Sequence, residues 1–161
     1  GERVIGPVFE YTEELAFDPT GRYLAGGGGD GRAWALDLPS VLAGASLDQA
    51  AREFQTRSTL VADVDVSRYG VLALSSTSGR VWLYDLATGE PAGEAIGRNP
   101  SGWVTSAFSP DGSFLLYTDD VLRRFDLDTQ RLVDLGENLV TREMTPTECE
   151  TYLGVNCEHD G

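Results

Sequence analysis

The chain has 161 residues, of which 41% are hydrophobic, and this length and composition suit one ordinary domain with a sizeable core. Its 26 acidic residues outnumber its 12 basic residues, and the net charge of -14 repels phosphate backbones and anionic lipids, so neither nucleic acid nor a membrane surface is expected as a partner. No apolar run approaches the roughly 18 residues of a membrane-spanning helix, and two cysteines near the end are too few for a secreted disulfide framework. We therefore expect a cytoplasmic protein.

The first predicted unit spans residues 15–38, "LAFDPTGRYLAGGGGDGRAWALDL". A short segment leads into the turn "DPTG", which has proline at its second position and glycine at its fourth, as a type I turn favours. A second segment, a glycine-rich turn and a third segment ending at Asp37 follow. Upstream, "GERVIGPVF" (1–9) is expected to be the outer strand of a preceding unit, so we expect the chain to be the C-terminal part of a longer protein.

An insertion follows, and within it residues 46–54, "SLDQAAREF", predict a short helix. Ser46 suits the N-cap, and helix-favouring residues fill the segment. Leu47, Ala50, Ala51 and Phe54 fall at i, i+3, i+4 and i+7, which makes a single apolar stripe. The helix is expected to pack on the rim of the sheet; a partner-binding helix is the alternative.

Two further units repeat the first, at residues 64–86, "VDVSRYGVLALSSTSGRVWLYDL", and 106–127, "SAFSPDGSFLLYTDDVLRRFDL". Gly70 and Gly112 match Gly21 at spacings of 49 and 42 residues, and the third segments close on Asp85 and Asp126 as the first does on Asp37. This period is typical of four-stranded propeller blades. Segments such as "VLALSS" are apolar on both faces, as expected of a sheet that is covered on both sides.

At these residues the chain resembles the WD40 repeat family in its bacterial form. The stretch "TGEPAGEAIGRNPSGWVTSAFSPDGSFLLYT" (88–118) is similar to the link between successive blades, and residues 1–38 follow the same pattern. The resemblance covers about residues 1–135 and implies an all-β fold: a partial β-propeller of about three blades, each of four antiparallel strands, within residues 1–136.

Two features depart from the family pattern. The Gly-His pair that often precedes each blade is absent, since the only histidine is His159. Trp34 and Trp82 occupy the family's tryptophan position, but Arg123 replaces it in the third unit. We therefore expect packing to hold the blades more than buried polar networks. Trp82 is expected to be buried between blades, with Asp85 organising the turn that follows.

Residues 137–161 are predicted to form a tail with a short C-terminal α-helix. Thr145 as N-cap, Pro146 and Glu148 make a helix start, and Gly154 suits the end. The phrase "NLVTREMTPTECETYLGVNC" resembles the ending of bacterial WD40 proteins with an upstream protease-like or STAND-type NTPase domain, with Cys149 where that family usually has tryptophan. We expect this helix to dock on the last blade.

The residues that could carry chemistry favour structural roles. "GGGGDG" (26–31) lacks a following Lys-Ser/Thr and leads into a strand, so it predicts a hairpin turn and not a phosphate loop. "DVDVS" (63–67) lacks the later ligands of a calcium loop and predicts a strand.

Two further groups of residues could carry chemistry. Cys149, Cys157 and His159 match no standard zinc spacing; a buried thiol is expected, and a local disulfide is an alternative. His159 is a poor general base for a nucleophile. Asp30, Asp119 and Asp120 are expected near one face as a solvated rim; an acid pair is the alternative. We predict no catalytic residue, metal site or cofactor.

The sequence thus favours a non-catalytic interaction or sensor module in a larger bacterial signalling or defence protein, and no enzymatic activity of the chain itself. Its partners would be another protein or upstream domains of the same polypeptide, with the remaining blades needed for closure. Two alternatives stay open. "SPDG" also marks propellers appended to peptidase-like or TolB-like hydrolases, although "YDLATGEP" argues against this, and a quinoprotein-type propeller enzyme would need cofactor-binding residues around a channel.

Overall fold

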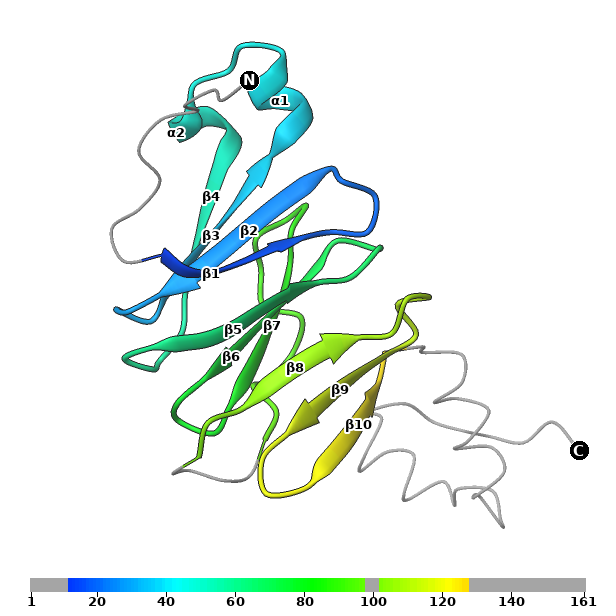
Figure 1. Ribbon diagram of the computed structural model, residues 1–161. Coiled ribbons are helices and arrows are strands. Elements are labelled where there is room, and N and C mark those ends of the chain that lie inside the picture. The colour runs from blue at the N-terminus through cyan, green and yellow to red at the C-terminus, as the bar shows by residue number, and fades with distance from the viewer. Residues whose placement is uncertain (1–11, 98–101, 128–161) are drawn as a thin grey trace, which may run out of the picture. The chain divides into compact units, whose positions relative to one another are not determined.

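The computed structural model describes residues 12–97 and 102–127, which fold into three antiparallel β-sheets with two short helices (Figure 1). The all-β class expected from the sequence is confirmed. The strand expected at residues 1–9, the C-terminal helix at 145–154 and the residues Cys149, Cys157 and His159 lie outside the described residues.

The first sheet has four strands in chain order, so it is a simple meander. Its strands are β1 (Thr12–Phe17), β2 (Tyr23–Gly28), β3 (Arg32–Asp37) and β4 (Ala51–Gln55). Two short helices, α1 (Leu38–Leu42) and α2 (Leu47–Ala50), occupy the connection between β3 and β4. In Figure 1 they sit at the end of the sheet where β3 finishes.

The second and third sheets repeat this meander with three strands each. The strands are β5 (Val61–Val66), β6 (Val71–Ser76) and β7 (Val81–Asp85), followed by β8 (Thr105–Phe108), β9 (Phe114–Thr118) and β10 (Leu122–Asp126). A further segment runs along the outer edge of β7, where Pro91 pairs with Tyr84 and Ile96 with Val81. This segment takes the position that β4 holds in the first sheet.

Each sheet has the same turn between its first two strands. A glycine N–H donates to the carbonyl oxygen three residues earlier, and this glycine has a positive φ that favours glycine over other residues. These glycines are Gly21, Gly70 and Gly112, with φ of 71°, 77° and 72° and N–H···O distances of 2.9, 3.1 and 2.8 Å. The turns predicted from the sequence are therefore confirmed.

The first residue of each turn is buried, and its side chain accepts a hydrogen bond from the backbone at the start of the next strand. Asp18 Oδ1 accepts from Tyr23 N at 2.6 Å, Ser67 Oγ from Val71 N at 3.0 Å, and Ser109 Oγ from Phe114 N at 3.1 Å. The third strands end at Asp37, Asp85 and Asp126, as expected. One structural unit is thus repeated three times.

The helix expected at residues 46–54 is shorter than predicted. It is confined to α2, for which Ser46 is the N-cap and donates its N–H to Gln49 Oε1 at 3.3 Å. The second half of the segment forms β4 because the edge of β3 offers backbone groups that need partners, and β4 satisfies them by antiparallel pairing. Phe54 is buried as a residue of β4 and not as part of an apolar helix face.

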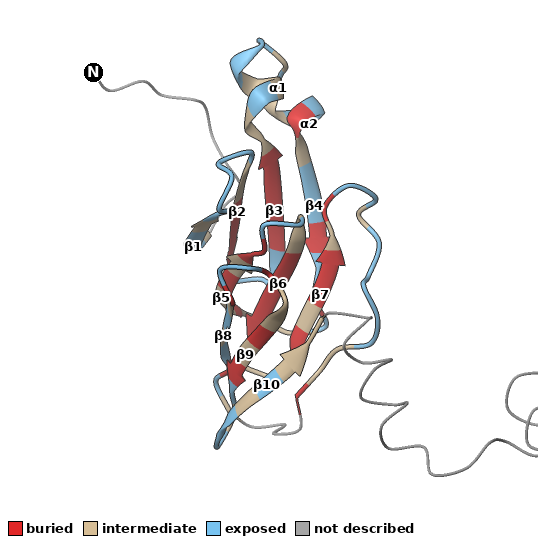
Figure 2. Ribbon diagram, turned by 90° about the vertical axis from the view of Figure 1, so that its right-hand side faces the viewer, coloured by how far each residue is buried: buried red, intermediate tan, exposed pale blue. Residues whose placement is uncertain are grey.

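The second sheet is covered on both faces. One face of β6 and β7 packs against the first sheet in a hydrophobic cluster, cluster 1, whose residues are given below. The other face packs against the third sheet in a second cluster, formed by Ala73, Val81, Leu83, Val104, Leu115 and Tyr117. Figure 2 shows β6 coloured as buried along most of its length, as its doubly apolar sequence predicted. The sheets therefore lie face to face in chain order.

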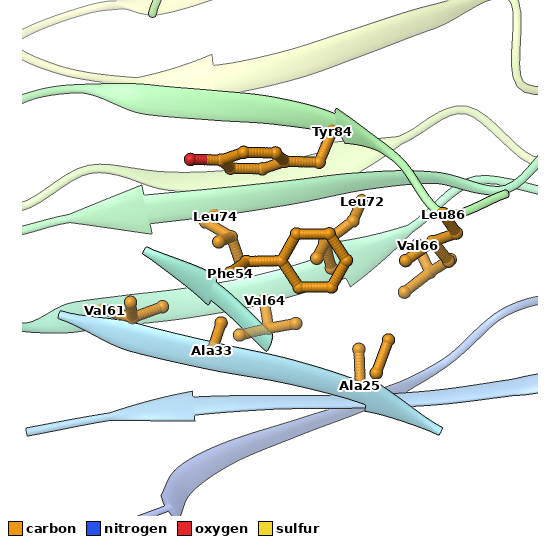
Figure 3. Close-up of a cluster of buried hydrophobic side chains, with 11 residues drawn as sticks. Ala25, Ala33, Phe54, Val61, Val64, Val66, Leu72, Leu74, Tyr84 and Leu86 are labelled. Atoms are coloured by element: carbon orange, nitrogen blue, oxygen red, sulfur yellow. The ribbon is translucent and has the colours of Figure 1, made fainter. Parts of the chain in front are cut away.

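Cluster 1 joins three alanines and a phenylalanine of the first sheet to larger aliphatic and aromatic residues of the second (Figure 3). The first sheet contributes Ala25, Ala33, Ala35 and Phe54, and the second contributes Val61, Val64, Val66, Leu72, Leu74, Tyr84 and Leu86. The rings of Phe54 and Tyr84 lie 5.1 Å apart at 54°, and the Tyr84 hydroxyl donates to the Gln55 carbonyl oxygen at 2.8 Å. Small residues opposite large ones let the two sheets approach closely.

The two repeat tryptophans differ in burial. Trp34 is 3% exposed, and its Nε1 donates to Thr12 Oγ1 at 3.0 Å. Trp82, which was expected to be buried between blades, is only partly buried and packs against cluster 1, so it is less buried than expected. Asp85 organises the following turn as expected, because its Oδ1 accepts the Thr88 N–H at 2.8 Å.

Candidate functional site

The outward face of β1 carries exposed apolar side chains. Leu15 and Phe17 are 62% and 63% exposed, whereas Ala16 between them packs against cluster 1. Because successive side chains of a strand point to opposite faces, Leu15 and Phe17 lie on the face turned away from the second sheet. Figure 2 shows β1 as one of the least buried strands. We refer to Leu15 and Phe17 as the β1 outer face.

A cavity of about 330 Å³ lies between the first and second sheets, at the end that carries α1 and α2. We call it the helix-end pocket. Leu86 and Ala87, which follow the last strand of the second sheet, form one wall of the pocket. The other walls come from the first sheet and its helical connection. The remaining lining residues are Arg22, Tyr23, Asp37, Ser40, Gln49, Ala50, Ala51 and Arg52.

One side of the pocket is held by a polar network around Asp37. The Ser40 hydroxyl donates to Asp37 Oδ2 at 3.0 Å, and Arg22 Nε lies 3.5 Å from Asp37 Oδ1. The Arg22 guanidinium also lies over the Tyr23 ring, 4.9 Å from its centre. Asp37 Oδ1 is buried and has no hydrogen bond among the described residues, so it retains capacity to accept one.

Arg52 of β4, an exposed residue, lines the other side of the pocket. Arg52 pairs in register with Ala35, a member of cluster 1, so its side chain emerges on the face that meets the second sheet. Hydrogen bonds from Thr88 lower the pKa of Asp85, and the Arg52 guanidinium adds to this effect. No carboxylate of the described residues lies within 4.0 Å of the Arg52 guanidinium.

The glycine-rich stretch 26–31 forms the end of β2 and the hairpin turn into β3, as predicted. Its glycines make room for neighbouring side chains. A Cβ on Gly26 would overlap the indole of Trp34, and a Cβ on Gly27 would lie 2.7 Å from Val61 of the second sheet. Because these two glycines have no side chains, Trp34 and Val61 can pack directly against the backbone of β2.

The stretch 63–67 falls in β5, which confirms the predicted strand. Its two carboxylates have a role that the sequence did not reveal. Asp63 Oδ2 accepts the Ser106 N–H at 2.7 Å and Asp65 Oδ2 accepts the Phe108 N–H at 2.6 Å, so β5 satisfies donors on the edge of β8. Burial raises the pKa of both carboxyl groups, and the hydrogen bonds partly oppose this.

The three rim aspartates are paired with arginines of their own hairpins. Asp30 pairs with Arg32 in the first sheet, and the hydrogen bonds from the Arg32 N–H and guanidinium lower its pKa. Asp119 and Asp120 both pair with Arg123 in the third sheet, at 2.7 and 3.4 Å, and this guanidinium holds the pKa of Asp119 well below its ordinary value. Among the described residues these aspartates form ion pairs and not an acid pair.

Residues 12–97 and 102–127 contain no group of three His, Cys, Asp or Glu side chains that could hold a metal ion. No helix in the same part of the chain is long and apolar enough to cross a bilayer. The sequence matches no family model, and no curated protein matches it significantly.

Sequence reasoning missed the helix-end pocket. The only signal was the length of the insertion after Asp37, which contributes Ser40, Gln49 and Ala50 to the lining. The other lining residues come from three strands, β2, β3 and β4, and from the turns before β2 and after β7, and only the register of the sheets brings them together.

Proposed function

We propose that the chain forms blades of a WD40-type β-propeller and acts as a non-catalytic protein-interaction module. From its tail, we propose that it belongs to a larger bacterial signalling protein and acts beside an enzymatic domain. Its partner is a neighbouring propeller sheet, supplied by the same polypeptide or by another protein.

The observation that carries the proposal is the exposed β1 outer face on a repeated stack of sheets. In the described structure, the second sheet is covered on both faces, whereas the first sheet leaves Leu15 and Phe17 more than 60% exposed. Large exposed apolar side chains on a flat sheet face are typical of interaction sites. Another sheet packed there would bury them as the first sheet buries Leu72 and Leu74.

Analytical ultracentrifugation of the 161-residue protein tests the proposal. Without a neighbouring sheet, the protein should self-associate through the β1 outer face, and its weight-average mass should rise with concentration. The double variant Leu15→Ser/Phe17→Ser should be monomeric over the same range. Because both side chains are exposed, its thermal stability as a monomer should change little.

Leu42→Ser is the matched control, because Leu42 is an apolar residue of α1 that is 78% exposed, well away in sequence from β1. This variant should associate as the unchanged protein does. A monomeric unchanged protein with a sharp, concentration-independent thermal transition would contradict the proposal. Equal loss of association in the Leu42 variant would show that exposure alone, and not the β1 outer face, drives the contact.

A further inference from the structure

The helix-end pocket exists because the first sheet has an extended connection between its third and fourth strands. In the second sheet the corresponding connection is a tight turn after β7, closed by the Gly89 N–H donating to the Asp85 carbonyl oxygen at 2.7 Å. In the first sheet, α1 and α2 replace that turn and contribute Ser40, Gln49 and Ala50 to the cavity. The pocket is therefore an addition to the repeated unit.

The pocket offers positive charge in a strongly acidic chain. Arg22 and Arg52 line it against one carboxylate, that of Asp37, although the whole chain has a net charge of -14. Arg22 is partly engaged by Asp37. Arg52 has no described carboxylate in ion-pair range, so its planar fork of N–H donors is the group best placed to bind an oxyanion.

Asp37 restricts which anion fits. Its Oδ1 atom is buried at the pocket and has Arg22 Nε in ion-pair contact at 3.5 Å but makes no hydrogen bond, so it can still accept one from an N–H or O–H donor. The same negative charge repels a phosphate dianion more strongly than a carboxylate, because the repulsion grows with the ligand's charge. The ligand that satisfies both sides carries one carboxylate and a neighbouring N–H.

We propose that the helix-end pocket binds the C-terminal residue of a peptide, with its carboxylate on Arg52 and its backbone N–H donating to Asp37. The cavity of about 330 Å³ is at the lower end of the range for ligand sites, and it suits one or two residues and not a longer segment. Tyr23 and Leu86 supply apolar surface for the terminal side chain. This site is separate from the β1 outer face.

The probe is N-acetyl-alanyl-alanine, which has a C-terminal carboxylate and an adjacent amide N–H. Its binding is followed by two-dimensional ¹⁵N–¹H NMR titration of the 161-residue protein, read at the amides of Ala87 and Gly89 beside the pocket. Three comparison ligands test the features of the probe one at a time. The same dipeptide with a C-terminal amide lacks the carboxylate, acetate lacks the amide N–H, and inorganic phosphate carries a different charge. Each should bind at least about tenfold more weakly, the loss of one charge-assisted contact.

The variant Arg52→Gln should weaken dipeptide binding at least about tenfold, and Arg52→Lys should restore part of it because lysine keeps the charge but not the fork. Arg32→Gln is the matched control: Arg32 is an exposed arginine at the opposite end of the same sheet, paired with Asp30, and its variant should bind normally. Asp37→Asn keeps an oxygen toward Ser40, removes the charge, and should bind phosphate more tightly than the unchanged protein.

Equal binding of the acid and the amide-capped dipeptide would overturn the proposal, as would unaltered binding by the Arg52→Gln variant. Tighter binding of phosphate than of the dipeptide by the unchanged protein would show that the pocket is a simple anion site. Equal binding of acetate and the dipeptide would show that the N–H contact with Asp37 does not contribute to binding, and would overturn the proposal that a peptide terminus is the ligand. None of these results bears on the β1 outer face, which the sedimentation experiment tests.

Discussion

Asp65 joins two sheets through a single hydrogen bond, and replacing it should reveal how much that bond contributes. Its carboxylate accepts the Phe108 N–H at 2.6 Å, across the boundary between β5 and β8. In the variant Asp65→Ala this donor loses its partner at a half-buried position. The free energy of unfolding should fall by about 1–2 kcal/mol, the usual penalty for an unsatisfied donor, reduced here because a carboxylate that burial disfavours is also removed.

Asp65→Asn is the matched comparison, because the amide oxygen can still accept the bond while the charge is gone. Its free energy of unfolding at neutral pH should lie within about 0.5 kcal/mol of that of the unchanged protein. Urea denaturation of the three proteins, at a concentration where each is monomeric, gives the values. Equal losses for the alanine and asparagine variants would refute the hydrogen-bond explanation.

The pH dependence gives a second test of the same carboxylates. Burial raises the folded-state pKa of Asp63 and Asp65 above the ordinary value of 3.8. The stability that this difference contributes is fully present below the unfolded-state pKa and is lost as the pH rises through the folded-state pKa. As the pH rises above about 4, the unchanged protein should therefore lose stability relative to Asp63→Asn/Asp65→Asn. The opposite trend in that difference would contradict the assignment.

Two paired substitutions test the packing. In urea denaturation, Trp34→Ala should lower the free energy of unfolding by about 3–5 kcal/mol. Trp82→Ala should lower it by only about 1–3 kcal/mol, because Trp82 is partly buried whereas Trp34 is fully buried. Equal losses for the two variants would contradict this ranking. Gly31→Ala should lower the melting temperature much more than Gly21→Ala. Both glycines have a positive φ, near 72° and 71°, but a Cβ on Gly31 would overlap a carbonyl oxygen of the next turn, whereas Gly21 faces open space. Similar melting temperatures would refute the close contact.

The repeated turns were predictable because their determinants are local. A proline or serine turn ending in Gly21, Gly70 or Gly112 needs only four residues to specify it, and the aspartates that end the third strands follow at a nearly constant distance. The double burial of β6 was also visible in its sequence, since a strand with apolar residues at successive positions needs cover on both faces.

The errors arose where distant residues decide the structure. Residues 51–55 favour a helix by local propensity, but the open edge of β3 draws them into β4. The helix α1 was missed because Leu38–Leu42 has only five residues and no side-chain cap. The hydrogen bonds from Ser106 and Phe108 to Asp63 and Asp65 span 43 residues, so no local pattern indicates them. The pocket depends in the same way on sheet register.

Hydrogen–deuterium exchange tests the central claim most directly, because it reads the protection of each strand in the monomer and in the associated protein. In the monomer, amides of β6 should exchange slowly, since both faces of their sheet are covered, and amides of β1 should exchange much faster. On association, β1 should become protected while β6 changes little. Rapid exchange of β1 in both states, with new protection elsewhere, would contradict the claim that the β1 outer face is the interaction surface.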